Sequence, residues 1–512
     1  MELDPADAGA LRADLLASGF TASGLRQLWG ADADAAVMRG QLLPARMAVA
    51  RRGTADARST LARLFVLGDT VPEKVLATAI PQLGVEGAAR LGLVEPLTGA
   101  DQGSLRALVS MKPHTFLDAG GAIDWWIVSD LDEAVTRGPL RPDHVVGVGG
   151  ASLTLLGLQP TARVSRVLDL GTGCGIQALL ARRHADRVVA TDISARALQF
   201  ARLNAAINGV EGIDFRLGDL FQPVAGERFD RIISNPPFVV TPRSEEVPTM
   251  EYRDGGRAGD DLMMDLIAQL RSRLTHGGTA VLLGNWEYHA ERDGLERIRL
   301  AAGRAGLDAW VIERDILSDS QYSETWIRDG GVLARTDRFD ELYRSWLADF
   351  AARDVDRIGL GYLILRNPAS GTPTLSRFER LHGALGADDT GLAGHLVACI
   401  AAHDWQVALT DDELLASRLT VAPDVTEQRH YWPGDEHPAV IDLRQGGGFG
   451  RTVEIDTALA GFVGACDGEL SVRSISDAVA ELLEADPAEL RAELLSQIRD
   501  LIEIGILLPG TG

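Results

Sequence analysis

The stretch VLDLGTGCGIQALLA, residues 167–181, combines a short apolar run, three closely spaced glycines and a helical pattern. It predicts a strand, a tight turn at Gly171, Gly173 and Gly175, and then a helix. Glycines at such a turn let a ligand approach the helix N-terminus closely. The spacing GxGxG differs from the dinucleotide pattern GxGxxG, because Ile176 stands where the third glycine would be. By itself, this turn would suit any nucleotide-like cofactor.

Acidic residues follow the next two predicted strands at spacings that suit a nucleoside. Asp192 ends the strand-like run VVATD, about twenty residues after the glycine turn, where a carboxylate can accept both ribose hydroxyls. The alternative is that Asp192 caps the following helix, a role that Ser194 could also fill. Asp219 follows a third strand, and it could accept a hydrogen bond from an adenine amino group or be a turn residue. Both acids favour a nucleoside at the strand ends.

The run RIISNPPFVV, residues 231–240, ends a fourth apolar strand with an Asn, two prolines and an aromatic residue. Pro-Pro suits a plain strand-terminating turn, because proline restricts φ and lacks an N–H. The alternative is a rigid pair of hydrogen-bond acceptors beside a ligand. Asn235 offers a side-chain oxygen, and Pro236 offers a carbonyl without a competing N–H. The glycine turn and the two acids before this run favour the second interpretation.

The segments DLGTGCG, TDIS, GDLF and SNPPF, in this order and spacing, resemble the class I S-adenosylmethionine-dependent methyltransferases with an Asn-Pro-Pro-Tyr or Asn-Pro-Pro-Phe motif. That branch includes HemK-like glutamine methyltransferases, small-domain methyltransferases and enzymes that methylate adenine or guanine amino groups. The resemblance covers residues 144–367. It implies a Rossmann-like α/β fold and S-adenosyl-L-methionine as the cofactor.

The resemblance also implies a role for each motif. The glycines pass beside the methionine moiety of the cofactor and Asp169 lies near its amino group, while Asp192 holds the ribose and Asp219 the adenine. Two acceptors hold the N–H bonds of the methylated nitrogen, and an aromatic ring stacks on a planar acceptor. Phe replaces the Tyr of some family members, which removes a hydroxyl. The implied catalytic residues are Asn235, Pro236 and Phe238, and the implied cofactor-binding residues are Asp169, Gly171, Gly173, Gly175, Asp192, Ile193, Asp219, Leu220 and Asn235.

Apolar periodicity divides the chain into four parts. Residues 1–103 predict a helical domain and residues 104–158 a bridging β segment. Residues 159–368 predict alternating strands and helices around a seven-stranded sheet, and residues 369–512 an α+β domain with a glycine-rich hairpin. In both the N-terminal and the C-terminal domain a helix stops at a glycine and a short apolar piece follows. This pattern is typical of winged-helix domains, so we expect both domains to be winged-helix-like. The last domain resembles the peptide-recognition domains of ribosomal-peptide pathways; alternatively, it completes the core or forms a dimer contact.

Composition narrows the partners of the chain. It has 73 Asp and Glu residues against 50 Lys and Arg residues, a formal net charge of -23 that disfavours a broad phosphate-binding surface. Three separated cysteines without a CxxC pair predict neither a disulfide framework nor a metal site. The N-terminus lacks a signal-peptide pattern, and no run of about 18 apolar residues occurs. We expect a cytoplasmic protein with a protein or peptide partner and no membrane partner, and a nucleic acid is the less favoured partner.

The predicted function is methylation of an amide or amine nitrogen of a protein or peptide, including a peptide natural product made on the ribosome. The alternatives are an exocyclic amine of a nucleobase in RNA or DNA, a small-molecule amine, and a cofactor-binding protein without activity. Residues 249–262, TMEYRDGGRAGDDL, could be a mobile substrate lid or a solvated loop. His144 is expected to be a capping or surface residue rather than a base.

Overall fold

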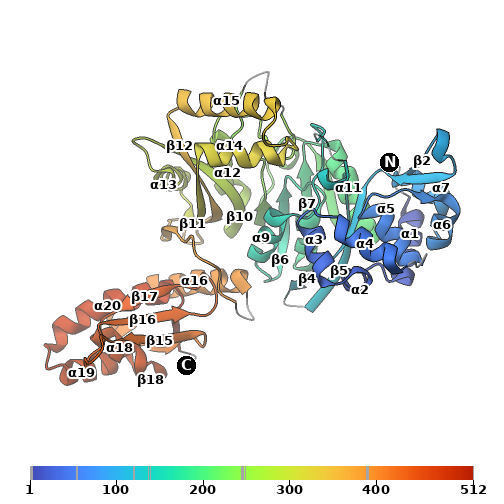
Figure 1. The fold of residues 1–512 in the computed structure, drawn as a ribbon. Coiled ribbons are helices and arrows are strands. Elements are labelled where there is room, and N and C mark those ends of the chain that lie inside the picture. The colour runs from blue at the N-terminus through green and yellow to red at the C-terminus, as the bar shows by residue number, and fades with distance from the viewer. Residues whose placement is uncertain are drawn as a thin grey trace. The chain divides into compact units, whose positions relative to one another are not determined.

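The computed structural model describes residues 4–52, 56–118, 121–136, 138, 140–243, 247, 249–387 and 391–510. The chain forms two compact units (Figure 1). Unit 1 contains Met1–Leu156 and Ala162–Glu379, and unit 2 contains Gly157–Thr161 and Arg380–Gly512. Among the described residues, no helix is long and apolar enough to cross a membrane.

An eight-stranded sheet of order β13-β11-β12-β10-β9-β6-β7-β8 forms the centre of unit 1. Strands β8, β7, β6, β9 and β10 run parallel, and β12 runs antiparallel to both β10 and β11. The predicted Rossmann-like α/β sheet is therefore confirmed, with the added edge strand β13. The strands are β6 (Val164–Leu170), β7 (Ala185–Asp192), β8 (Ile213–Leu217), β9 (Phe229–Ser234), β10 (Leu274–His289), β11 (Asp308–Ser318), β12 (Val355–Arg366) and β13 (Ser376–Arg380).

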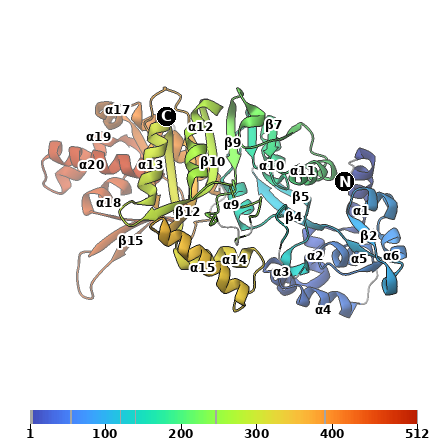
Figure 2. The same ribbon diagram turned by 90° about the horizontal axis from the view of Figure 1, so that it is seen from above.

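Helices cover both faces of this sheet (Figure 2). Apolar residues of the central strands are buried on both faces, as the continuous apolar runs predict. Alternate residues such as Leu168, Leu170 and Ile232 pack in one core with α12 and α13. The helices that follow these strands are α10 (Ile176–Arg183), α11 (Ala195–Asn208), η2 (Gln222–Val224), α12 (Asp261–Arg273), α13 (Gly294–Ala305), α14 (Asp319–Asp329) and α15 (Asp337–Ala352).

The N-terminal helices share a hydrophobic core with α10 and α11, so they belong to the same unit as the sheet. Strand β3 completes a small sheet with β1 and β2, although the sequence pattern places its residues in the bridging segment. The elements are α1 (Pro5–Ser18), α2 (Ala22–Trp29), α3 (Ala31–Met38), α4 (Leu43–Arg52), α5 (Ala57–Phe65), β1 (Val71–Pro72), α6 (Glu73–Ala79), α7 (Gly84–Arg90), β2 (Val94–Pro96), η1 (Gly99–Asp101), β3 (Ser104–Ala107), β4 (Ser110–Asp118), β5 (Gly121–Ser129), α8 (Glu133–Thr136) and α9 (Gly150–Leu158).

Two asparagines of α11 attach the β4–β5 hairpin. Asn204 Oδ1 accepts the Val128 N–H at 2.8 Å, and its Nδ2 donates to the Val128 carbonyl at 2.9 Å. Asn208 bonds the N–H and carbonyl of Trp126 in the same way, at 3.0 and 2.8 Å. Asn204 Nδ2 also donates to the Cys174 carbonyl at 2.8 Å, which lies inside the glycine turn. The hairpin and the glycine turn are thus joined through one side chain.

Unit 2 contains two small sheets and five helices among its described residues. The antiparallel pair β16–β17 confirms the predicted glycine-rich hairpin, and its Gly447 N–H donates to Asp424 at 2.8 Å. The elements are α16 (Gly391–Val407), α17 (Asp411–Ala416), β14 (Arg418–Val421), β15 (Val425–His430), β16 (Val440–Gln445), β17 (Thr452–Ile455), α18 (Thr457–Gly464), β18 (Asp467–Ser471), α19 (Val472–Leu482), α20 (Pro487–Glu503) and β19 (Leu507–Pro509).

The N-terminal helical domain and the C-terminal domain differ in the strands that follow their last helix. At the N-terminal end α7 is followed by the antiparallel strands β2 and β3, the helix-to-hairpin order that the sequence predicts. At the C-terminal end α20 is followed by the single strand β19, which pairs with β14. The winged-helix assignment of both domains stays a prediction.

Candidate active site

The carboxyl ends of four neighbouring strands bring the predicted polar residues to one edge of the sheet. Asp169 lies at the end of β6, Asp192 ends β7, Asp219 follows β8, and Asn235 directly follows β9. Strand β6 lies between β7 and β9, so the strand order reverses there. Ligands of open α/β sheets bind outside the carboxyl ends of the strands at such a reversal.

The three glycines of the turn meet different needs. All three have positive φ, at 75°, 53° and 88° for Gly171, Gly173 and Gly175. A Cβ at Gly175 would lie 2.9 Å from the Cβ of Ala201, so this glycine lets α11 pack closely. A Cβ at Gly171 or Gly173 would meet no atom of the described chain within 4 Å. These two glycines therefore line an open cradle that suits close approach of a ligand.

Asp192 is held by the backbone around it. Its Oδ2 accepts the Gly173 N–H at 2.8 Å, and its Oδ1 accepts the Ser194 N–H at 2.8 Å. The N-cap of α11 is Ser194, and Ile193 between them is 62% exposed. Burial raises the pKa of Asp192. Each carboxylate oxygen keeps a further lone pair, so two ribose hydroxyls can still be accepted.

Asp169 is a buried carboxyl, with 1% of its surface exposed. Thr172 Oγ1 donates to its Oδ2 at 2.5 Å, while Oδ1 has no hydrogen-bond partner in the described part of the chain. Burial raises the pKa of Asp169 to about 7. A buried carboxylate with a free oxygen is stabilised by a nearby cation. The amino group of S-adenosylmethionine is such a cation, so this residue fits the cofactor.

Asp219 lies in a turn and is half-buried. Its carbonyl accepts the Gln222 N–H at 2.9 Å, and the next residue, Leu220, has a φ of 45°. A leucine in the left-handed region is uncommon and marks a constrained backbone. Both interpretations of Asp219 therefore remain compatible, because a turn residue can also present its carboxylate to an adenine amino group.

We call the segment that follows β9, residues 235–241, the acceptor loop. Asn235 Oδ1 is buried and has no hydrogen-bond partner among the described residues. The Pro236 carbonyl accepts the Phe238 N–H at 2.7 Å in a three-residue turn, which leaves one of its two lone pairs. Ser234 Oγ donates to the Leu170 carbonyl at 2.7 Å and so fastens β9 to β6. Asn235 and Pro236 therefore directly follow a strand end that is held in place by β6.

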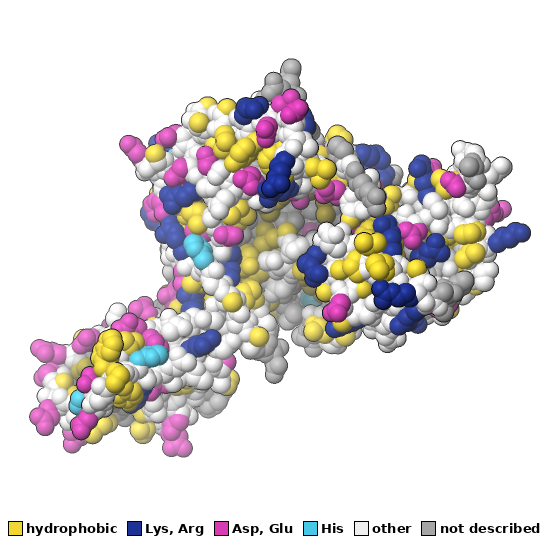
Figure 3. Space-filling model, viewed as in Figure 1, with side chains coloured by type: hydrophobic (Ala, Val, Ile, Leu, Met, Phe, Trp, Pro, Cys, Tyr) yellow, Lys and Arg dark blue, Asp and Glu magenta, His cyan; other side chains and the backbone are white. Residues whose placement is uncertain are grey.

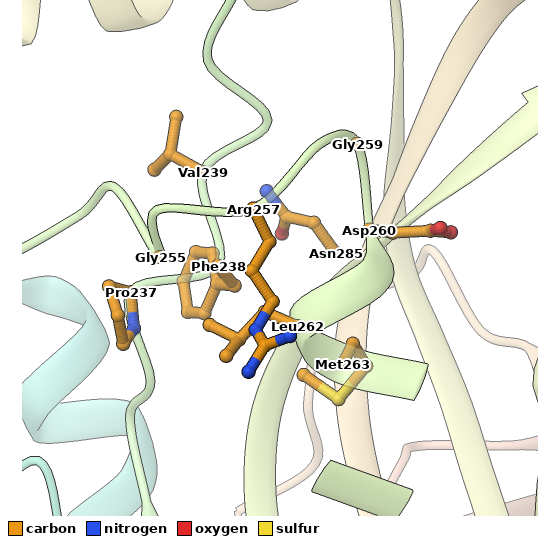
Figure 4. A pocket seen from close by; sticks show the side chains of 10 residues that line it. All are labelled: Pro237, Phe238, Val239, Gly255, Arg257, Gly259, Asp260, Leu262, Met263 and Asn285. Atoms are coloured by element: carbon orange, nitrogen blue, oxygen red, sulfur yellow. The ribbon is translucent and has the colours of Figure 1, made fainter. Parts of the chain in front are cut away.

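Phe238 lies in a small pocket on the side of β10 and α12. Figure 4 shows its ring beside Leu262 and the side chain of Arg257, with Asn285 close by. Phe238 also pairs with Asp254 in an isolated antiparallel bridge. Phe238 is half-buried, so a part of its surface remains exposed.

The centre of residues 249–262 is packed into the protein, so it is not the solvated loop that the sequence also allowed. Arg253 and Asp254 are only 6% and 7% exposed. Arg253 Nη1 donates to the Trp326 carbonyl at 2.6 Å and to Asp329 at 3.0 Å. Its own carbonyl accepts the Val239 N–H at 2.9 Å. This segment therefore supports the acceptor loop, a role for which the sequence carried no signal beyond a charged pair.

His144 is buried, so the surface alternative that the sequence offered for it is wrong. Its Nδ1 lies 4.0 Å from Asp130, a carboxyl at the end of the β4–β5 hairpin. Asp130 also accepts hydrogen bonds from Arg196 of α11 and from the Val145 N–H. These contacts hold the segment around His144 against α11, which explains the burial of the imidazole. No local sequence pattern marks such a contact between distant segments.

Comparisons with known proteins agree with this geometry. A family model described as "Methyltransferase small domain" matches residues 147–298. Two further models, each described as a domain of unknown function, match residues 17–108 and 398–509.

Three curated relatives illustrate the similarity. The release factor glutamine methyltransferase of Xylella fastidiosa strain Temecula1 is 35% identical over 235 residues, which cover 43% of this chain and 80% of that protein. The ribosomal protein uL3 glutamine methyltransferase of Bradyrhizobium diazoefficiens is 38% identical over 151 residues, covering 28% of this chain and 46% of that protein. The ribosomal RNA small subunit methyltransferase C of Escherichia coli O1:K1 is 35% identical over 229 residues, covering 43% of this chain and 57% of that protein.

Proposed function

Because the chain belongs to the S-adenosylmethionine-dependent methyltransferases with a small methyltransferase domain, we propose that it methylates the side-chain amide nitrogen of glutamine in a protein or peptide. Two of the relatives carry glutamine methylation of a protein in their names. An amine nitrogen of a polypeptide is the alternative acceptor.

The observation that carries the proposal is the pair of acceptors at the end of β9. An amide nitrogen attacks poorly, because its lone pair is delocalised into the carbonyl. Asn235 Oδ1, buried and without a partner in the described residues, and the free lone pair of the Pro236 carbonyl can each accept one N–H of a primary amide. Holding both N–H bonds turns the nitrogen lone pair toward the methyl donor.

The acids at the neighbouring strand ends would hold the cofactor. Asp169 would bind its amino group and Asp192 its ribose hydroxyls, and bound S-adenosylmethionine supplies an electrophilic methyl group. The N–CH3 bond would form as the S–CH3 bond of the cofactor breaks and S-adenosylhomocysteine leaves. The positive charge would then lie on the nitrogen, whose N–H bonds point at Asn235 and Pro236. One of these protons leaves to water, so no strong base is needed.

A nucleobase is the second candidate, because one relative is named for methylation of ribosomal RNA. Charge favours a polypeptide instead. Residues 380–512 carry 8 Arg and no Lys against 23 Asp and Glu, a net charge of -15 within the -23 of the chain. Figure 3 shows acidic side chains spread over the visible face of this unit. Such a surface repels nucleic acid and attracts a basic polypeptide.

The cytoplasm is the proposed compartment. Cys174 and Cys466 are free thiols in the structure, and both are buried. Free thiols persist where the surroundings are reducing.

The test is label transfer from tritiated S-adenosylmethionine to an array of glutamine-containing peptides and to RNA and DNA oligonucleotides. We expect label in peptides with Gln, and none after its replacement by Glu. Asn235→Ala should abolish the transfer while binding of S-adenosylhomocysteine, measured by calorimetry, is kept. Arg163→Gln at the opposite end of the sheet is the control and should leave both unchanged. Label in RNA, or full transfer by Asn235→Ala, would reject the proposal.

A further inference from the structure

The acceptor loop is fastened beyond its catalytic end. The Val240 N–H donates to the Tyr322 hydroxyl at 3.0 Å, across the space between the loop and α14. On the other side, the Val239 N–H donates to the Arg253 carbonyl. Two successive backbone groups are therefore held from two directions, which leaves the loop little freedom to shift.

Tyr322 is fully buried, and a second polar side chain reaches its hydroxyl. Asn285 of β10, 1% exposed, lies with its side-chain amide 2.6 Å from the Tyr322 oxygen. Trp346 and Phe350 of α15 pack around the tyrosine ring. Burying a hydroxyl costs free energy unless it is hydrogen-bonded. The Tyr322 hydroxyl meets this need with a backbone group of the acceptor loop and with Asn285, so the bond that satisfies it also fixes the loop.

The hydrogen-bond balance of this group also assigns the Asn285 amide. A tyrosine hydroxyl has one proton to donate and can accept further bonds. Val240 supplies a donor, so the hydroxyl proton needs an acceptor, and Asn285 Oδ1 has no other partner in the described chain. Oxygen and nitrogen of an amide exchange places on a half-turn. Pairing the hydroxyl with Oδ1 gives the hydroxyl proton an acceptor, and the Asn285 NH2 then takes the place where Oδ1 has no partner in the described chain.

We propose that the Tyr322 hydroxyl, oriented by Asn285, positions the acceptor loop so that Asn235 and Pro236 meet the methyl acceptor at the correct angle. This inference rests on the proposed function. Tyr322 and Asn285 are positioning residues, because they act through Val240 and not on the acceptor itself. The polar chain runs from β10 through α14 to the loop and joins segments that are far apart in the sequence.

The test compares Tyr322→Phe with Tyr343→Phe, whose hydroxyl lies on α15, 3.4 Å from Glu324 and partly exposed. Tyr322→Phe should lower kcat about 10- to 100-fold, since a small misplacement of reacting groups is costly. KM for the peptide and the Kd for S-adenosylhomocysteine should stay unchanged. Tyr343→Phe should match the unaltered chain in all three.

Hydrogen exchange followed by mass spectrometry gives a readout that needs no substrate. The amides of residues 238–241 should exchange faster in Tyr322→Phe and in Asn285→Ala, while exchange in the glycine turn stays the same. The double variant should lose no more kcat than Tyr322→Phe alone, because both residues serve one bond.

The outcomes separate this inference from the function on which it rests. Unchanged exchange at residues 238–241 in Tyr322→Phe overturns the positioning role, whatever the substrate. Faster exchange with an unchanged kcat overturns it too, because the bond would then be merely structural. If the unaltered chain transfers no methyl group to any glutamine peptide, the proposed function fails. The exchange result still shows whether the Tyr322 hydroxyl holds the acceptor loop.

Discussion

The backbone N–H of Gly173 donates to Oδ2 of Asp192 at 2.8 Å, so the glycine turn after β6 and the carboxylate at the end of β7 are one connected structure. The turn is also tied to β7 by the N–H groups of Gly171 and Thr172, which both donate to the Thr191 carbonyl at 2.9 Å. The carboxylate is thereby held in place by the backbone, so a ribose that binds there would require little further ordering.

Asp192→Asn should weaken S-adenosylhomocysteine binding about 10- to 100-fold, because hydrogen bonds to a charged acceptor contribute about 1.5–3 kcal/mol. The new amide would also bring an NH2 group against the Gly173 or Ser194 N–H. Calorimetric titration measures the change. Asp186→Asn, at the exposed opposite end of the same strand, should bind the ligand as the unaltered chain does. Equal affinities of the two variants would contradict the ribose role.

Cofactor binding should strengthen as the pH rises toward 7. The pKa of Asp169 in the folded protein is raised to about 7, above its value in the unfolded chain. The folded form therefore holds a proton between about pH 4 and 7, and this contribution to stability is lost as the pH rises through 7. A ligand amino group needs the ionised carboxylate, so binding below pH 7 must expel the proton. The affinity for S-adenosylhomocysteine should thus increase from about pH 5.5 to 7 and then level off.

Two controls isolate Asp169 in that titration. Methylthioadenosine, which lacks the amino-acid part of the cofactor, should show a weaker pH dependence. Asp169→Asn should bind S-adenosylhomocysteine poorly and with little pH dependence over the same range. A steep dependence that survives in this variant would assign the proton to another group.

Gly175→Ala should mainly lower the stability of the fold, whereas Gly173→Ala should mainly weaken cofactor binding. At Gly175 the added methyl meets Ala201 at 2.9 Å and the φ is 88°, so we expect a loss of about 2–4 kcal/mol in unfolding free energy. At Gly173 the methyl meets no described atom within 4 Å, and the φ of 53° costs about 1–2 kcal/mol. Gly173→Ala should therefore fold but bind S-adenosylhomocysteine poorly. Urea unfolding and calorimetry distinguish the two effects.

Asn204→Ala and Asn208→Ala form a matched pair on α11. Each leaves the N–H and carbonyl of one β5 residue without its side-chain partner, which should cost about 2–4 kcal/mol of unfolding free energy. Only Asn204 also bonds the Cys174 carbonyl of the glycine turn. Asn204→Ala should therefore weaken cofactor binding in addition, whereas Asn208→Ala should not. Equal affinities would show that the turn does not depend on this bond.

The residues that sequence reasoning found share one property: each lies at the carboxyl end of a strand. Asp169, Asp192 and Asn235 could be located because a parallel sheet brings its carboxyl ends together, and the glycine turn identifies the first strand. Tyr322 and Asn285 could not be located. Their contact joins a helix to a strand 37 residues away, and no local pattern encodes such a pairing.

Packing between distant segments also decides how the elements group, and the predicted domain bounds stay a prediction. The N-terminal helices look self-contained in sequence because their apolar stripes are regular, yet their core continues into α10 and α11. The edge strand β13 lies beyond the predicted end of the sheet domain. Both the shared core of the N-terminal helices and the added edge strand depend on burial against segments far away in the sequence. Local periodicity does not indicate such burial.

The asparagines of α11 protect a sheet edge. Strand β5 pairs with β4 on one side, and on its other side Asn204 and Asn208 occupy the backbone groups of Val128 and Trp126. An uncovered edge of this kind invites pairing with another chain. A shortened chain beginning at residue 159 would lose this hairpin, and both amides would lose their β5 partners. The separated N-terminal fragment would be prone to self-association. Residues Met1–Leu156 are therefore an integral part of the compact unit that contains the large sheet, rather than a detachable accessory.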